Sequence, residues 1–138
     1  MIAYIDSSVI LRVLLGQRPV LKQWAEWQRA YTSELAGIEA RRVIDRLRLD
    51  GALDDEGVAL AHEQLARIEA SIGHIRLTRT ILRRAALPMA TVVRTLDALH
   101  LASALVLRER RGLALSFATH DDQQATAARA LGFACLGV

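Results

Sequence analysis

A short apolar run that ends in an acid opens the chain, and similar runs alternate with helical patterns throughout. Met1–Ile5 has the length and composition of a buried strand, Asp6 ends it, and an apolar helical pattern covers Val9–Leu15. Strands that alternate with helices predict a parallel sheet with helices on both faces and right-handed crossovers. We therefore expect an α/β protein with three layers, α/β/α, around a small central parallel sheet.

Glycine and proline residues set the expected boundaries of the other elements. Further strands are expected at 30–33, 74–77, 113–119 and 133–136. Helices are expected at 20–29, 34–50, 54–71, between Thr78 and Pro88, and at 94–111 and 121–131. No repeat, low-complexity segment or linker divides the 138 residues, so a single domain is expected over 1–138.

Composition limits the class of protein. Hydrophobic residues make up 52% of the chain and charged residues 24%, which is typical of a folded globular domain. No apolar run approaches the roughly 18 residues of a transmembrane helix, and the first residues lack the pattern of a secretion signal. The single cysteine, Cys135, cannot form an internal disulfide, as is usual in a reducing compartment. We expect a cytoplasmic protein that does not enter a membrane.

The charge balance favours an acidic partner, although weakly. The formal net charge is +3, and Lys22 is the only lysine, so arginine supplies nearly all the positive charge. Guanidinium groups bind phosphate with two parallel hydrogen bonds and stack on bases, which makes nucleic acid a plausible partner. A modest positive balance is, however, more often a feature of solvation than of recognition.

Two acids occupy core-facing positions of expected helices. Asp97 lies in an almost wholly apolar helix, where an unpaired carboxylate is costly. Its local alternative is an ion pair with Arg94. Glu39 falls inside an apolar stripe that contains Leu35, Ile38, Val43 and Leu47, and its local alternative is an ion pair with Arg42. Glu34, close by, is expected to serve the first turn of the same helix.

Two other acidic positions follow strands directly. Asp6 follows the first strand, and Asp121 and Asp122 follow the fourth. Each could simply cap the helix that comes next. In an open parallel sheet, however, ligands bind at the carboxyl ends of the strands, so the same residues also stand where chemistry is expected.

Convergence of these acids would require a cation. Like charges in one cleft raise each other's pKa unless something positive binds, and no lysine is available there. Carboxylate oxygens suit Mg²⁺ or Mn²⁺, whereas the histidines, at positions 62, 74, 100 and 120, lack the spacing of a zinc site.

The motifs together resemble one family along the whole chain. Ile5-Asp6-Ser7-Ser8, Ser33-Glu34-Leu35 through Ile38-Glu39, Asp97-Ala98-Leu99-His100-Leu101-Ala102 and Thr119-His120-Asp121 are similar to those of PIN domains, and more narrowly of VapC-type toxins of bacterial toxin–antitoxin pairs. The resemblance implies an acidic Mg²⁺ or Mn²⁺ pocket, endoribonuclease activity on RNA, a homodimer and a cognate antitoxin protein. It gives Asp6, Glu39, Asp97 and Asp121 as both catalytic residues and metal ligands, with Ser8, Thr119 and Asp122 as secondary candidates.

Three readings of the function remain open from the sequence. In a nuclease, one or two metal ions held by the carboxylates would stabilise the charge that develops on the phosphoryl oxygens and activate water, and a single-stranded RNA loop is the expected target. A PIN-like binding module without catalysis is the alternative. A receiver-type phosphoacceptor domain is disfavoured because it would need a lysine at a strand end, and Lys22 lies between two early expected helices.

Overall fold

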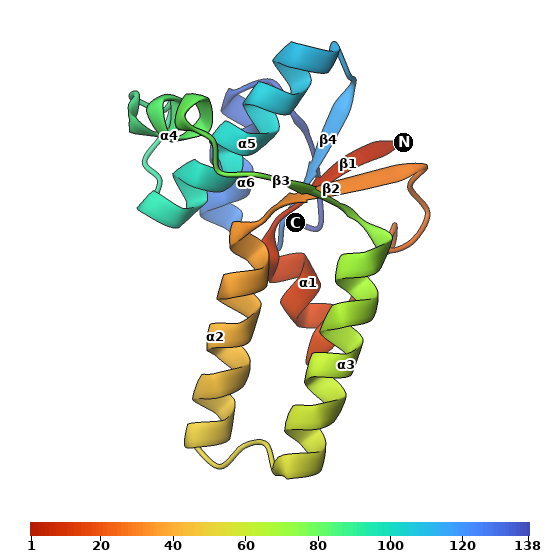
Figure 1. Ribbon diagram of the computed structural model, residues 1–138. Helices are drawn as coiled ribbons and strands as arrows, with labels where there is room; N and C mark the ends of the chain where they lie inside the picture. The colour runs from red at the N-terminus through yellow and green to blue at the C-terminus, as the bar shows by residue number, and fades with distance from the viewer.

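A central parallel sheet with helices on both faces forms the protein (Figure 1). The computed structural model describes residues 1–138. The strands are β1 (Ile2–Ile5), β2 (Arg29–Ser33), β3 (Gly73–Ile75), β4 (Leu115–Ala118) and β5 (Ala134–Leu136). The helices are α1 (Ser7–Leu14), α2 (Leu35–Leu49), α3 (Asp55–Ser71), α4 (Arg79–Ala86), α5 (Thr95–Arg111) and α6 (Asp122–Ala130). The three-layer α/β/α expectation is confirmed.

All strand pairs are parallel, in the order β3-β2-β1-β4-β5. The chain thus starts in the middle of the sheet, and β1 pairs with β2 on one side and with β4 on the other. The register joins Ile5 to Ala118, so the residues that follow β1 and β4 leave the sheet side by side. This places the acids after both strands at one edge of the sheet.

The alternation of side chains along the strands builds two cores. On one face, Ile5 and Ala118 belong to a cluster with buried residues of α1, α2 and α3. On the other face, Tyr4 and Phe117 stack at 5.2 Å and pack against α5 and α6. Helix α4 adds to this layer from outside, where Ile81 contacts Ala102 and Val106 of α5.

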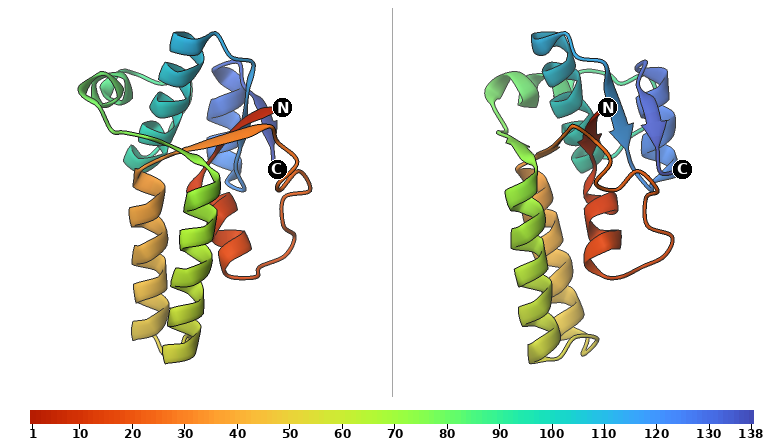
Figure 2. Two further views of the ribbon diagram at one scale, coloured as in Figure 1. Left: turned by 45° about the vertical axis from the view of Figure 1, so that its right-hand side comes forward. Right: turned by 90° about the vertical axis from the view of Figure 1, so that its right-hand side faces the viewer.

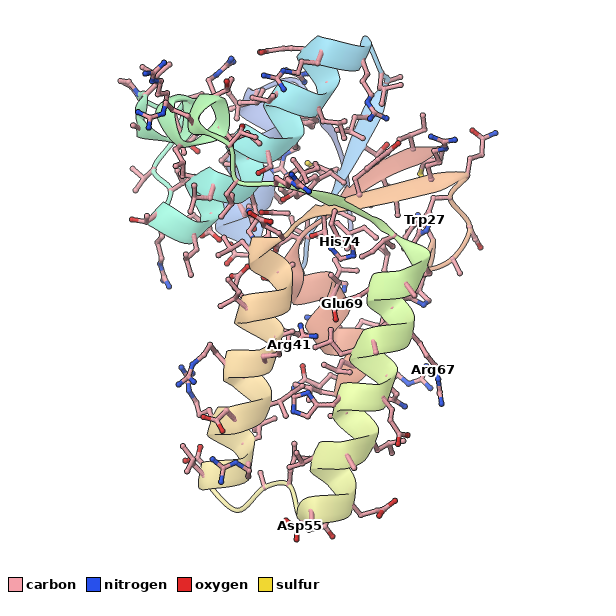
Figure 3. The ribbon with its side chains drawn as sticks, in the orientation of Figure 1. Trp27, Arg41, Asp55, Arg67, Glu69 and His74 are labelled. Carbon is pink, nitrogen blue, oxygen red and sulfur yellow. The ribbon has the colours of Figure 1, made fainter.

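Helices α2 and α3 form an antiparallel hairpin that extends well beyond the sheet (Figure 2). Arg41 of α2 and Glu69 of α3 join the two helices by paired hydrogen bonds of 2.7 and 3.1 Å (Figure 3). At the far end Asp54 caps α3, because its side chain accepts from the Gly57 N–H at 2.8 Å. None of the six helices is both long enough and apolar enough to cross a bilayer.

The helix expected at 20–29 is wrong. Residues between α1 and β2 form turns, with Ala25 at φ 67°, a conformation that no right-handed helix contains. The segment must return from the end of α1 to the start of β2, and the Gln28 N–H bonds to the Met1 carbonyl at 2.8 Å. Trp24 and Trp27 contact each other edge to face at 5.1 Å and are partly buried against the α1–α3 cluster.

The apolar stripe proposed for α2 is partly wrong as well. Its buried residues are Leu35, Ala36, Ala40 and Ile44. Ile38 is 58% exposed, since this side of α2 faces neither the sheet nor α3. The buried face of α2 thus combines two alanines, Ala36 and Ala40, with two large residues, Leu35 and Ile44.

Replacing Ile44 by alanine tests this assignment of the core. Ile44 is 1% exposed, so Ile44→Ala should lower the free energy of unfolding by about 2–5 kcal/mol through lost burial and a cavity. Ile38→Ala, the same change on the same helix, should change it by no more than about 0.5 kcal/mol. Chemical denaturation measures both, and similar losses in the two variants would contradict the burial of Ile44.

Candidate active site

Asp6 lies at the centre of the site, at the carboxyl end of β1. It is 3% exposed, and its backbone N–H continues the sheet by bonding to the Ala118 carbonyl at 2.9 Å. Its Oδ2 accepts hydrogen bonds from the Ser8 hydroxyl at 2.7 Å and the Thr119 hydroxyl at 2.8 Å. Asp6 occupies the N-cap position of α1 without capping it. The helix-cap alternative is therefore wrong for this residue.

The end of β4 is tied to the same carboxylate. Thr119 Oγ1 donates to Asp6 and accepts from the Asp121 N–H at 3.1 Å, while Ser8 Oγ accepts from the His120 N–H at 2.9 Å. Asp121 does cap its helix: its Oδ1 accepts from the Gln124 N–H at 2.9 Å, which leaves its Oδ2 without a partner. The two hydroxyls therefore hold the tips of β1 and β4 together.

His100 and Tyr4 position the second acid. Glu39, in the second turn of α2, is 18% exposed and lies 2.6 Å from Nε2 of the fully buried His100. A carboxylate can only accept, so Nε2 carries the proton. In the neutral ring, Nδ1 accepts from the Tyr4 hydroxyl at 2.6 Å, and that hydroxyl itself accepts from the Ser33 N–H at 3.2 Å. The pair with Arg42, expected as the local alternative for Glu39, is absent because Arg42 pairs with Asp45.

The ring of His100 also faces Asp6, with Nε2 3.7 Å from Oδ1. Burial, the largest effect, lowers the pKa of His100. The hydrogen bond to Glu39 and the charges of Asp6, Glu39 and Asp97 outweigh burial, so the pKa is raised above its usual value. His100 is thus a buried donor between two carboxylates.

Asp97 completes the cluster from the first turn of α5. It forms no ion pair with Arg94, so this local alternative is wrong, and its side chain accepts no hydrogen bond. Its pKa is raised, first by partial burial and then by the charges of Asp6, Asp121 and Glu39, with His100 acting in the opposite direction. The four acids singled out from the sequence are therefore close enough to influence one another.

Other residues near the site differ from expectation. Asp122 lies exposed in the first turn of α6. Glu34 does not serve the start of α2, because its Oε1 accepts from the Leu77 N–H, beyond β3, at 2.8 Å.

Tyr4 and Gln124 were missed by sequence reasoning. Gln124 is fully buried, and its Nε2 donates to the Asp97 carbonyl at 3.4 Å. A polar residue in the buried stripe of α6 was the available signal for it.

The donor set suits a divalent cation by its chemistry, because the negative charges of the carboxylates act on one another and no lysine or arginine pairs with them. No three of the histidine, cysteine, aspartate and glutamate side chains are gathered closely enough to form a ready-made metal site. Binding of Mg²⁺ or Mn²⁺ would therefore have to bring the carboxylates closer together than they stand here.

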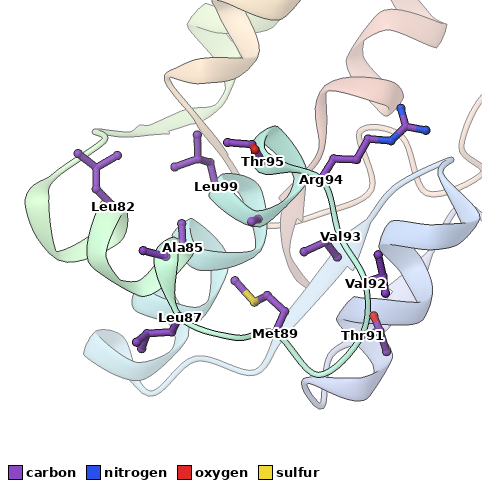
Figure 4. Close-up of a pocket in the computed structure, with 12 residues that line it drawn as sticks. Leu82, Ala85, Leu87, Met89, Thr91, Val92, Val93, Arg94, Thr95 and Leu99 are labelled. Atoms are coloured by element: carbon purple, nitrogen blue, oxygen red, sulfur yellow. The ribbon is translucent and has the colours of Figure 1, made fainter.

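An apolar cavity is lined in part by the first turn of α5, the turn that also carries Asp97 (Figure 4). Its volume is about 630 Å³, and it lies between α4, the connection after it and the first turns of α5. Arg94, Thr95 and Ala98 line it, so Asp97 stands between two of its lining residues in the sequence. Val92, at its rim, is 80% exposed.

The parallel sheet in the order β3-β2-β1-β4-β5 and the acidic residues where β1 and β4 end identify an α/β domain with its candidate site at the carboxyl edge of the sheet. The PIN domain family model matches residues 3–130, so the chain belongs to the PIN domain family. No curated protein sequence matches the chain.

Solved structures with the same fold come from distant relatives. A toxin–antitoxin complex from Klebsiella pneumoniae contains a chain with a TM-score of 0.63 and 17% identity, covering 93% of both chains. FitAcB from Neisseria gonorrhoeae gives 0.65 and 19%, covering 98% of this chain and 96% of that one. PAE2754 from Pyrobaculum aerophilum gives 0.65 and 18%, covering 96% and 81%. At these identities the likeness concerns the fold.

Removing the hydroxyl of Tyr4 tests the buried chain of hydrogen bonds. Tyr4→Phe leaves His100 Nδ1 and the Ser33 N–H without partners, which should lower the free energy of unfolding by about 1–3 kcal/mol. Tyr31→Phe is the matched control. It removes a hydroxyl bonded only to exposed arginines and should cost no more than about 0.5 kcal/mol. Equal effects in denaturant titrations would contradict the assignment.

Proposed function

We propose that this PIN domain is a Mg²⁺- or Mn²⁺-dependent endoribonuclease and acts as the toxin of a toxin–antitoxin pair. The observation that supports the proposal best is the environment of Asp97. Its carboxylate has no hydrogen-bond donor, and three other carboxylates raise its pKa. A group arranged in this way stabilises nothing in the protein alone, and a bound cation would give it a partner.

In this proposal the four acids Asp6, Glu39, Asp97 and Asp121 hold the metal. The metal, when bound, stabilises charge on the phosphoryl oxygens and lowers the pKa of water. Ser8 and Thr119 fix the orientation of Asp6 by donating to its Oδ2. His100 occupies Oε1 of Glu39 and leaves Oε2 for the cation, and the cap of α6 occupies Oδ1 of Asp121 in the same way. A carboxylate of this set also accepts the proton of the attacking water.

The remaining parts of the proposal concern partners and place. A Klebsiella pneumoniae protein of the same fold belongs to a toxin–antitoxin complex, and this supports a cognate antitoxin for the present chain. Exposed apolar side chains that line the cavity of Figure 4, among them Leu82, Leu87 and Val92, are of the kind that protein partners cover. A homodimer and a cytoplasmic location stay predictions, as made from the sequence.

One observation favours the second candidate, a PIN-like binding module without catalysis. Three of the acids are engaged by hydrogen-bond donors of the protein itself, and no three side chains form a ready-made metal site. If the metal binds weakly or not at all, the protein is such a module without catalysis. The two experiments below separate the candidates.

Replacing Asp97 by asparagine should abolish cleavage without loss of fold. Because the side chain accepts no hydrogen bond, Asp97→Asn removes charge and little else. We expect the rate of RNA cleavage in Mg²⁺ to fall by more than about 100-fold. Loss of a residue that only hydrogen-bonds to a metal ligand costs about 10- to 100-fold, so the larger loss indicates a ligand. Asp122→Asn, an exposed acid nearby, should retain activity. Activity that survives both Asp97→Asn and Asp6→Asn, measured on protein freed of any partner, would exclude the nuclease proposal.

Metal binding has its own readout in thermal unfolding. Mg²⁺ or Mn²⁺ that binds only the folded protein adds RT ln(1 + [L]/Kd) to the free energy of unfolding, so Tm should rise with increasing metal concentration. In Asp97→Asn this increase should be lost, while the Tm without metal stays the same or rises, because one of the repelling charges is gone. A wild-type Tm that does not respond to either metal would favour the module without catalysis.

A further inference from the structure

A second polar cleft lies at the β3 edge of the sheet, between β3, the start of α4 and the end of α5. Its volume is about 300 Å³. We call it the basic cleft and define it by five polar residues that line it: Tyr31, Arg76, Thr78, Arg110 and Arg111. His74 contributes no side chain to it, because its ring bonds to the Glu69 carbonyl of α3 at 2.8 Å, on the other face of the sheet (Figure 3). None of these residues belongs to the acidic cluster.

The basic cleft has a charge that the protein does not neutralise. No acidic residue lines it, and Arg76, Arg110 and Arg111 are exposed and form no ion pair. Other arginines of the chain, such as Arg41 and Arg84, are paired with glutamates. Unpaired charges of one sign in a concave surface repel each other and concentrate anions from solution. The arrangement therefore favours an anionic ligand.

Tyr31 forms the aromatic wall of the cleft, and its position requires a glycine beside it on β3. A Cβ on Gly73 would lie 2.6 Å from Cδ1 of Tyr31, so only glycine at this position lets the ring cross β3. The Tyr31 hydroxyl accepts from Arg111 at 3.2 Å and from Arg29 at 3.5 Å. Hydrogen bonding by Arg29, the largest effect, and the charge of Arg111 lower the pKa of Tyr31, which makes its hydroxyl a better donor. Guanidinium groups and a phenol together match the acceptors of a phosphate.

The position of the cleft relates it to the acidic cluster. Arg76 follows β3 at the same edge of the sheet at which Asp6 follows β1. Neighbouring strands lie about 4.8 Å apart, so β3 lies about 10 Å from β1. Arg110 and Arg111 are further away, because they end the helix whose first turn carries Asp97, and at 1.5 Å per residue they lie about 20 Å from it along α5. One extended RNA strand of several nucleotides can span both distances. The acids themselves repel phosphate. A nuclease with this site must therefore hold its substrate's backbone by positive groups outside it.

We propose that the basic cleft binds the phosphodiester backbone of single-stranded RNA on one side of the bond to be cut. The proposal rests on the proposed function for its choice of RNA, and the cleft itself is a separate site with its own measurement. Backbone contacts carry no sequence information, so the cleft contributes affinity and register, and the bases are read elsewhere.

Binding without cleavage tests the cleft directly. A fluorescently labelled single-stranded RNA is titrated with the protein in EDTA, and anisotropy gives Kd over a range of KCl concentrations. The double variant Arg110→Ala/Arg111→Ala should bind at least about 10-fold more weakly. Its plot of log K against log[KCl] should be shallower by about 1.4, since each lost phosphate contact removes about 0.7 for a single strand. Arg76→Ala, which removes a side chain that makes no hydrogen bond in the protein, should reduce the slope by about half as much.

Arg46→Ala/Arg67→Ala is the matched control, since it removes the same charge from exposed, unpaired positions on α2 and α3. Arg67 is labelled in Figure 3. Its Kd and slope should stay within about twofold and 0.3 of the wild type, and Tm values confirm that all variants are folded. Equal losses in the two double variants would overturn the proposal, because binding would then follow net charge alone. Wild-type protein that binds no RNA in EDTA would overturn it too, and would point to an acidic protein as the ligand.

The outcomes for cleft and nuclease are separable. RNA cleavage by the wild type together with binding that does not depend on Arg76, Arg110 or Arg111 would overturn the cleft and leave the nuclease in place. Binding that depends on the cleft, with no cleavage in Mg²⁺ or Mn²⁺, would exclude the nuclease and support the cleft as the RNA site of a module without catalysis.

Discussion

The hydrogen bonds that Ser8 and Thr119 donate to Asp6 are the constraint on which the site depends. They join the ends of two strands that are neighbours in space and separated by 113 positions in the chain. A nearly buried carboxylate needs donors, and here hydroxyls supply them where a helix N-terminus could have done so. The choice matters, because hydroxyls from two elements fix the carboxylate more firmly than one flexible cap would. The rest of the cluster is arranged around this fixed charge.

His100 shows how the protein tolerates a second carboxylate next to the first. Glu39 and Asp6 flank one buried imidazole ring, and the far side of that ring rests on the Tyr4 hydroxyl. Because each partner fixes the next, Glu39 has one oxygen committed and one available. Asp97 has no such support. Hydrogen-bond donors of the protein thus hold three of the carboxylates, whereas the fourth, Asp97, has none. In a network with only a structural role, each buried polar group would have a partner.

Much of this arrangement could be predicted from the sequence, and the exceptions have physical causes. Alternating strand and helix patterns gave the parallel sheet, and strand ends gave Asp6 and Asp121, because both depend on local periodicity. Glu39 and Asp97 followed from carboxylates at apolar positions.

The turn at 20–29 was not predictable, since the path between α1 and β2 is set by the sheet and not by the helical spacing of Trp24 and Trp27. Tyr4 was not predictable either, because a tyrosine in a buried strand gives no sign of the partner that its hydroxyl will meet. Glu34 was misjudged for the same reason: its partner, Leu77, is 43 positions away.

The central place of β1 has a consequence for the order in which the molecule can be assembled. β1 is made first, yet one of its two neighbours, β4, is made more than a hundred residues later. While a ribosome is still synthesising the middle of the chain, Asp6 has neither Thr119 beside it nor Asp121 nearby. A partly synthesised chain therefore contains some of the acids but not their arrangement, and whatever chemistry the cluster performs has to wait until β4 has joined β1.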